Sequence, residues 1–251
     1  MNRTATDELD RLDEAFANNR LLSTFPAEAR ALVEPFGTVV ELDTGETVHA
    51  RGASVASTYF PFGPAMISLA IDMANGRSIE VASIGHEGAV GGIVSCGHAP
   101  AFARSQVLVP GPALQVPMEA LEDAKMRSGL IRNLFCRYSD YLLAQVMQSV
   151  ACNSFHTIEQ RAARWLLTAQ DRAGSTIELT QEAFAALLGV QRTTVNAVIG
   201  TLQDEGLITT RRGRIQVIDR AGLKRRACEC HDCVEHHFAA VIGTSGSGTP
   251  A

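Results

Sequence analysis

The sequence predicts an α+β protein: an N-terminal antiparallel β-roll, jelly-roll-like in its strand pattern, then a long helix and a small helical domain that includes a β-hairpin. Three observations predict this fold class. Short β-rich runs separated by turn residues occupy residues 36–117. Apolar residues at three- and four-residue steps follow over residues 118–151. Two short helical patterns that meet at a glycine, and then a β-rich run with an Arg-Gly turn, occupy residues 180–218.

The composition is that of a globular chain. The 251 residues, 46% of them hydrophobic and 20% charged, suffice for two modest domains. No apolar run approaches the roughly 20 residues that span a bilayer, and the polar, acidic N-terminus has no signal-peptide core. We therefore expect a cytoplasmic protein without a membrane partner, whose cysteines are mostly reduced.

The N-terminal half reads as a short helical segment followed by strands. Residues 7–34 show helical spacing, and Asn75-Gly76 between two β-rich runs is a strong hairpin signal. Strands and helices do not alternate, which argues against a Rossmann-type sheet. The glycine-rich stretch at residues 84–106 lacks the spacing of the usual phosphate-binding loops.

The apolar stripe after residue 118 predicts one long amphipathic helix, which is a natural homodimer seam between two domains. The alternative is a helix that packs only on its own β-roll. The stripe consists of Leu130, Ile131, Leu134, Phe135, Tyr138, Tyr141, Leu142 and Val146.

Residues 180–202 predict a helix-turn-helix motif. Thr180 can cap the first helix, because its hydroxyl can accept from a free backbone N–H. Gly189 fits the left-handed position that ends a helix. Val195, Val198, Ile199 and Leu202 form the inward stripe of the second helix. The other side of this helix is polar, as in a helix that lies in a DNA groove. The candidate DNA contacts are Thr180, Gln191, Arg192, Thr193, Thr194 and Asn196.

A predicted basic hairpin follows this motif and supports the same function. Arg211, Arg212 and Arg214 surround its turn, where they can reach backbone phosphates. The net charge of −5 argues against nucleic-acid binding, but residues 151–227 carry 11 Lys and Arg against 7 Asp and Glu. An ordinary helical hairpin with a solvated basic turn is the alternative. We expect no enzyme, because the chain lacks the Gly-x-Ser-x-Gly, His-Glu-x-x-His and Walker motifs.

With a β-roll, a long helix and a winged helix-turn-helix in this order, the chain resembles the Crp/Fnr family of bacterial transcription regulators over residues 20–227. The motifs that carry the resemblance are LTQEAFAALLGVQRTTVNAVIGTLQDEGLI and RRGRIQVIDRAGL. It implies a homodimer that senses an effector in the β-roll and relays it to two recognition helices on a pseudo-palindromic DNA operator. RNA polymerase is a further implied partner.

The resemblance also assigns individual roles on the recognition helix. Arg192 stands where family members often place an arginine that reads guanine, through two hydrogen bonds to O6 and N7. The glutamate common at the next position is Thr193 here, and a later family arginine is Ala197. The operator should therefore differ from that of the cyclic-AMP receptor protein.

In the β-roll, the resemblance places the effector site at Gly91, Gly92, Arg104 and Ser105. Gly92 occupies the position of the glutamate that holds the ribose in cyclic-nucleotide binders, so cyclic AMP is not the expected effector. The effector stays unknown. No iron–sulfur cluster is expected, because no cysteine precedes Cys96, and His49, His86 and His98 are interpreted as polar surface rather than haem ligands.

The segment CECHDCVEHH offers Cys228, Cys230, Cys233 and His231 as candidate metal ligands. Four-ligand sites usually combine two separated segments, and only one is evident, so the sequence favours a structural role over metal binding. Cys96, Cys136 and Cys152 are interpreted as packing residues.

The predicted domains are a sensor β-roll, a dimerisation helix, a winged helix-turn-helix domain, a Cys/His-rich segment and a disordered tail. Their ranges are 20–117, 118–152, 153–227, 228–242 and 243–251. The alternative function is a small-molecule or redox-sensing interaction protein whose winged helix contacts protein rather than DNA.

Overall fold

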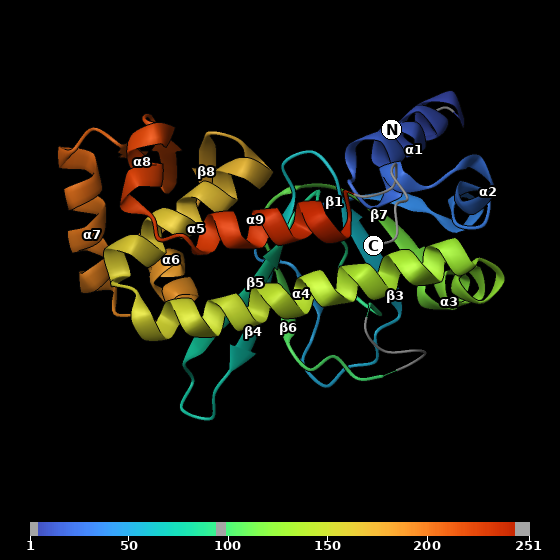
Figure 1. Cartoon of the computed structure of the whole chain (residues 1–251), viewed down its shortest axis with the longest axis horizontal. Coiled ribbons are helices and arrows are strands. Elements are labelled where there is room, and N and C mark those ends of the chain that lie inside the picture. The colour runs from blue at the N-terminus through green and yellow to red at the C-terminus, as the bar shows by residue number, and fades with distance from the viewer. Residues whose placement is uncertain (1–4, 94–98, 244–251) are drawn as a thin grey trace, which may run out of the picture.

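The computed structural model describes residues 5–93 and 99–243 of the chain. The predicted tail lies outside these residues except for Gly243, and so do Cys96 and His98. Figure 1 shows the β-roll and the helix-turn-helix domain at opposite ends of a long helix, α4. None of the described helices combines the length and the hydropathy that a bilayer-spanning segment needs.

Two antiparallel sheets form the N-terminal domain, and they confirm the predicted fold class. One sheet has the order β1-β7-β3 and the other the order β2-β6-β4-β5. The β4–β5 hairpin turns at the predicted Asn75-Gly76. The strands are β1 (Thr38–Leu42), β2 (Thr47–His49), β3 (Ser57–Pro61), β4 (Met66–Asp72), β5 (Ser78–Ile84), β6 (Arg104–Val109) and β7 (Gly111–Pro117).

Short N-terminal helices pack against the first sheet through apolar side chains such as Phe16 and Leu22. Asn19 fixes this attachment, because its buried side-chain amide donates to the carbonyl oxygens of Pro61 and Gly88, both at 2.8 Å. The helical segments are α1 (Ala5–Asn18), α2 (Ala27–Arg30) and the 3₁₀ turns η1 (Leu22–Thr24) and η2 (Glu34–Phe36).

The prediction of one continuous helix after residue 118 was wrong. Two helices, α3 (Met118–Arg127) and α4 (Gly129–Phe155), are separated at Ser128. Ser128 has extended backbone angles, and its hydroxyl accepts from the backbone N–H of Ile131 at 3.3 Å. A serine that caps a new helix in this way ends the old one.

The predicted seam residues lie mostly inside the chain's own core. Ile131, Leu134, Phe135, Tyr138 and Tyr141 are buried against the β-roll and the N-terminal helices. A different stripe of α4 is exposed. It consists of Leu143, Met147 and Val150, with exposed fractions of 56%, 57% and 63%.

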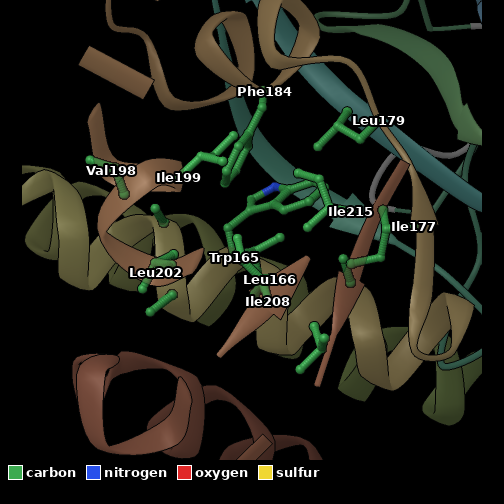
Figure 2. Packing of buried hydrophobic residues seen from close by; sticks show 14 of the residues in the cluster. Trp165, Leu166, Ile177, Leu179, Phe184, Val198, Ile199, Leu202, Ile208 and Ile215 are labelled. Atoms are coloured by element: carbon green, nitrogen blue, oxygen red, sulfur yellow. The ribbon is translucent and has the colours of Figure 1, made fainter. Parts of the chain in front are cut away.

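The C-terminal domain is built around Trp165, which lies among the side chains of two helices and a small sheet (Figure 2). Phe184 packs on its ring with a centroid distance of 5.2 Å. The elements are α5 (Ile158–Ala173), β8 (Thr176–Glu178), α6 (Gln181–Leu188), α7 (Arg192–Asp204), β9 (Ile208–Arg211), β10 (Arg214–Val217) and α8 (Arg220–Arg226).

A last helix, α9 (Cys230–Val241), was not predicted from the sequence. It runs back along α4 towards the β-roll (Figure 1). The ring of Phe238 meets that of Tyr141 edge-on at 4.9 Å, and the Arg20 guanidinium lies 4.0 Å from the Phe238 ring. The predicted Cys/His-rich segment is therefore an ordered strut between the two domains.

Candidate nucleic-acid interface

The local sequence of the helix-turn-helix motif sets its geometry as predicted. The Thr180 hydroxyl accepts from the Ala183 N–H at 3.1 Å and so caps α6. Gly189 ends α6 with φ of 68°, a conformation that glycine adopts without a steric penalty. The Val190 N–H then donates to the Ala185 carbonyl oxygen at 3.0 Å, which closes the turn before α7.

The two faces of α7 are separated cleanly. Val195, Val198, Ile199 and Leu202 are at most 3% exposed and pack in the core of Figure 2. The opposite face is open to solvent. Its exposed residues are Gln191, Arg192, Thr193, Asn196 and Ala197, with Thr194 half-buried beside them. The polar side chains are thus free to enter a groove of DNA.

The predicted basic hairpin is formed by β9 and β10. Its tip carries Arg211 and Arg212, both exposed, and Arg212 adopts a positive φ of 46° in the turn. Arg214 is also exposed but forms an ion pair with Glu178 of the neighbouring β8. Two of the three predicted wing arginines are thus unpaired within the described residues.

A hollow separates the wing from the start of both helices. Its lining includes Thr180, Glu182, Arg192, Arg211 and Arg212. Four guanidinium groups, including that of Arg214, outnumber the single carboxylate, and the first residues of α6 line the same hollow. Among the described residues, Arg214 forms an ion pair with Glu178, whereas Arg192, Arg211 and Arg212 form none. This surface suits an anion such as a phosphate of DNA.

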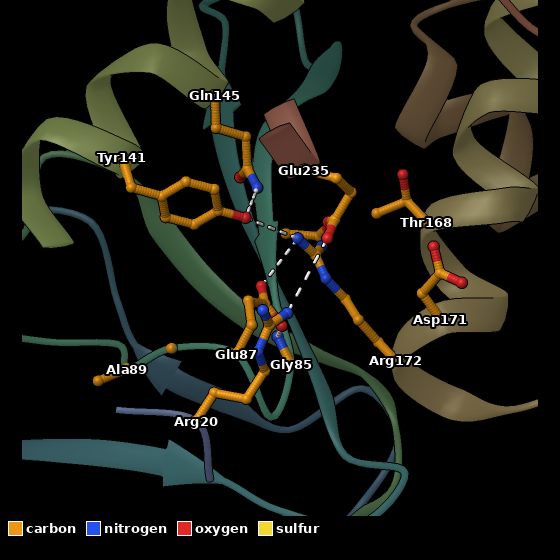
Figure 3. Close-up of polar contacts among 12 residues, drawn as sticks. Arg20, Gly85, Glu87, Ala89, Tyr141, Gln145, Thr168, Asp171, Arg172 and Glu235 are labelled. Carbon is orange, nitrogen blue, oxygen red and sulfur yellow. Dashed lines mark hydrogen bonds and ion pairs between the residues drawn. The ribbon is translucent and has the colours of Figure 1, made fainter. Parts of the chain in front are cut away.

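A buried ion pair joins this domain to the β-roll, and the sequence did not reveal it. Arg172 of α5 reaches Glu87 at 2.8 Å, with both side chains 4% exposed. Its guanidinium also donates to the Ser83 hydroxyl at 2.6 Å and to the Tyr141 hydroxyl at 3.4 Å (Figure 3). Glu87 accepts in addition from the Gly85 N–H.

The β4–β5 hairpin contacts the helix-turn-helix directly. Arg77 donates to the carbonyl oxygen of Gly189 at 3.1 Å, and the Ile79 side chain packs on the same glycine. Glu80 accepts from the Trp165 indole N–H at 2.7 Å, and burial raises the pKa of this carboxyl. A strand of the β-roll thus touches both the turn and the core of the DNA-binding domain.

The predicted effector residues lie in two segments of the β-roll, Arg104 and Ser105 on β6 and Gly91 and Gly92 in the loop after β5. Arg104 is bound by Asp72 through two contacts of 2.9 Å, and this guanidinium lowers the pKa of Asp72 to about 2. Ser105 is 4% exposed in the same strand. At Gly92 a side chain would meet the Met118 methyl group, only 2.0 Å from an ideal Cβ, and at Gly91 it would meet the Ser57 carbonyl oxygen.

His49 differs from its interpretation as a surface residue. It is 7% exposed, and its Nε2 lies 2.9 Å from the Ser57 carbonyl oxygen. Burial lowers the pKa of this imidazole.

The C-terminal cysteines and histidines divide into two groups. Cys228 and Cys230 are buried beside Cys152 of α4. Cys233 is exposed, and both ring nitrogens of His231 contact carboxylates, those of Asp171 at 2.8 Å and Asp232 at 3.0 Å. The packing interpretation of Cys136 was wrong, because this thiol is exposed.

The comparisons with known proteins agree with this geometry. Residues 160–226 match the family model of the Crp-like helix-turn-helix domain. No curated protein matches the chain. The C-terminal domain is therefore a Crp-like helix-turn-helix domain, as the resemblance predicted.

Solved structures share the fold over about three quarters of this chain at low identity. FixK2 from Bradyrhizobium japonicum is 15% identical with a TM-score of 0.64, covering 76% of this chain and 98% of that one. TTHB099, a CRP-family transcriptional regulator from Thermus thermophilus, is 19% identical with a TM-score of 0.62, covering 75% and 96%. The c-di-GMP-responsive global regulator CLP from Xanthomonas campestris is 15% identical with a TM-score of 0.61, covering 77% and 100%. The chain thus has the fold of Crp/Fnr transcriptional regulators.

Proposed function

We propose that this chain is a homodimeric transcription regulator that inserts α7 of each protomer into the major groove of a pseudo-palindromic operator. One observation carries the proposal. The polar face of α7, with Arg192 at its start, is exposed beside the wing tip, where Arg211 and Arg212 have no ion pair among the described residues. A recognition helix needs base-reading side chains together with nearby phosphate contacts.

The roles within this surface follow from position. Arg192 donates to guanine, while Gln191, Thr193, Thr194 and Asn196 contact bases or phosphates. Arg211 and Arg212 bind the adjacent backbone. The Thr180 hydroxyl already accepts from Ala183, but it can still donate to a phosphate oxygen.

The exposed stripe of α4 supports dimerisation. Leu143, Met147 and Val150 recur at four- and three-residue steps and leave apolar surface in water. A second copy of α4 would cover this stripe and place two α7 helices on one side of the dimer. The seam would therefore use the face opposite to most of the residues that the sequence suggested.

The contacts between β-roll and helix-turn-helix support an effector relay. Arg172 and Trp165 of α5 each bind a residue of β5. In the other direction, Arg77 of the β4–β5 hairpin binds Gly189 at the end of α6. Such a relay needs two arrangements of the β-roll relative to the helix-turn-helix domain. An effector with different affinities for these two arrangements would shift the equilibrium between them. The occupation of Arg104 by Asp72 and the crowding at Gly92 support the expectation that cyclic AMP is not this effector. We expect the regulator to act in the cytoplasm and to contact RNA polymerase.

Selection from random duplex DNA tests this function. The full chain should enrich an inverted repeat whose half-sites are one helical turn apart, about 10 base pairs. Binding should weaken linearly on a log–log plot as salt increases. If no sequence is enriched and duplex DNA is not bound at physiological salt, the alternative of a winged helix that contacts protein replaces this proposal.

A further inference from the structure

Four side chains with metal-binding chemistry meet where α4 ends. We call Cys152, His156, Cys228 and Cys230 the thiol–imidazole cluster. Their ligand atoms all lie within 4.8 Å of one another. The three cysteines are at most 5% exposed. Two separate segments therefore supply the ligands, although the sequence analysis recognised only the second.

Two distances within the cluster are close to the edges of a tetrahedral metal site. The sulfurs of Cys152 and Cys228 are 3.6 Å apart, and the Cys230 sulfur is 3.4 Å from Nδ1 of His156. Around one Zn²⁺, with bonds of about 2.3 Å to sulfur and about 2.0 Å to nitrogen, the tetrahedral edges are roughly 3.8 Å and 3.5 Å. We propose that the cluster binds one Zn²⁺-type ion through three thiolates and one imidazole.

The surroundings of the ligands support this assignment. Nε2 of His156 lies 3.3 Å from the Glu229 carboxylate, so Nδ1 is left to face the thiols. A carboxylate behind the second ring nitrogen is the usual arrangement for a metal-bound histidine. The side-chain amide of Gln148 donates to the Cys230 sulfur at 3.0 Å, a contact of the kind that orients a metal ligand.

The charge balance points to the same class of ion. Three thiolates and one divalent ion leave a formal charge of −1, and the charges of Arg161 and Arg164 act on Cys152. Both arginines line a cleft between α4, α5 and α9 that reaches Cys230. Thiolates and imidazole select Zn²⁺ over Mg²⁺ or Ca²⁺. A polynuclear iron–sulfur cluster divides its four protein ligands between two or more irons, so some of the ligand atoms would lie farther apart than the 4.8 Å found here.

The position of the ion gives it a structural role at the junction of the two domains. Cys152 is in the last turn of α4, and His156 lies directly before α5, which begins at the Thr157 cap. Cys228 and Cys230 precede and begin α9, which packs along α4 to the β-roll. One ion would therefore fix the angle between α4 and the DNA-binding domain. Arg161 extends this link, because it donates to the Leu188 carbonyl oxygen at the end of α6.

Metal analysis of the full chain, purified without an affinity metal and without chelators under reducing conditions, tests the proposal. About one zinc per chain is expected, either as isolated or after incubation with one equivalent of Zn²⁺. Cys152→Ser and Cys228→Ser should each abolish stoichiometric binding. Cys233→Ser and Cys136→Ser are the matched controls, because these exposed thiols lie outside the cluster, and both should retain the zinc.

A second variant keeps the test decisive if the serine variants fail to fold. His156→Cys converts the ligand set from three cysteines and one histidine to four cysteines, so it should retain one zinc. With Co²⁺ in its place, the variant should show altered visible absorption relative to the wild type. A wild-type chain that binds no zinc with its thiols reduced, a Cys152–Cys228 disulfide in the reduced preparation, or iron with acid-labile sulfide would overturn the proposal. The metal content is measured without DNA, so this test does not depend on the proposed function.

Discussion

Two groups of arginines differ in exposure and in ion pairing. On the helix-turn-helix, Arg192, Arg211 and Arg212 are exposed, and in the described part of the molecule none forms an ion pair. In the β-roll, Arg104 is bound by Asp72. At the junction of the two domains, Arg172 of α5 is enclosed by Glu87, Ser83 and Tyr141. The three arginines that face the predicted DNA surface are therefore unpaired, whereas Arg104 and Arg172 are each ion-paired within the chain.

This difference in ion pairing distinguishes a surface that can bind a ligand from the Arg172–Glu87 contact, which holds the two domains together. An arginine whose charge is satisfied inside the chain has little to offer a ligand, whereas an unpaired, exposed arginine loses little when it binds a phosphate. The DNA-binding surface is therefore preformed. The residues that the resemblance assigned to effector binding are engaged with their own neighbours instead.

The largest effect is expected at the Arg172–Glu87 contact. Arg172→Met leaves the buried Glu87 carboxylate without its cation, which typically costs about 3–5 kcal/mol of unfolding free energy. Urea unfolding at neutral pH measures this loss. Adding Glu87→Gln to the same chain removes the stranded charge and should recover most of the stability. If the single variant is as stable as the wild type, the pair does not join the domains.

The wing arginines should affect DNA binding without affecting stability. Arg211→Ala with Arg212→Ala removes two phosphate contacts per protomer, so the slope of log affinity against log salt should become shallower by about 2 per protomer. Affinity titrations at several salt concentrations measure the slope. An unchanged slope would place the wing away from the DNA backbone.

The smallest effect is expected at the half-buried Arg104–Asp72 pair. Because Arg104 lowers the pKa of Asp72 to about 2, the pair contributes stability above the unfolded pKa of about 3.9, and this contribution is lost as the pH falls through about 2. At neutral pH, Asp72→Asn should cost less than about 1 kcal/mol, because solvent screens the pair. Unfolding at pH 7 and pH 3 should show the variant approaching the wild type in acid. If the difference in unfolding free energy between variant and wild type were the same at both pH values, the charge of the Asp72 carboxylate would not be the source of the stabilisation.

Sequence reasoning succeeded where a few neighbouring residues fix the structure. The Thr180 cap, the left-handed Gly189 and the apolar stripe of α7 act over one or two helical turns, so their pattern was readable. The Asn75-Gly76 turn is local in the same sense. Residues with a clear local signal were therefore placed correctly.

Contacts between residues that are far apart in the sequence were not predicted. Glu87 and Arg172, like Cys152 and Cys228, meet only because α5 and α9 pack against α4 and the β-roll. The apolar stripe of α4 was predicted correctly. The surface against which it packs was not, because periodicity does not distinguish a helix face in the chain's own core from one in a dimer interface. The spacing of Cys152 and His156, four residues apart at a helix end, was the one signal that could have revealed the second ligand segment.

The central claim is that the outward face of α7 reads DNA, and Arg192→Ala on the selected operator tests it most directly. The account predicts an affinity loss of about 5- to 150-fold per half-site, corresponding to about 1–3 kcal/mol, and relaxed preference at one base pair in each half-site. Arg127→Ala, which removes the same charge from exposed α3 at the other end of the molecule (Figure 1), should leave both unchanged. Unaltered affinity and unaltered base preference in Arg192→Ala would contradict the account.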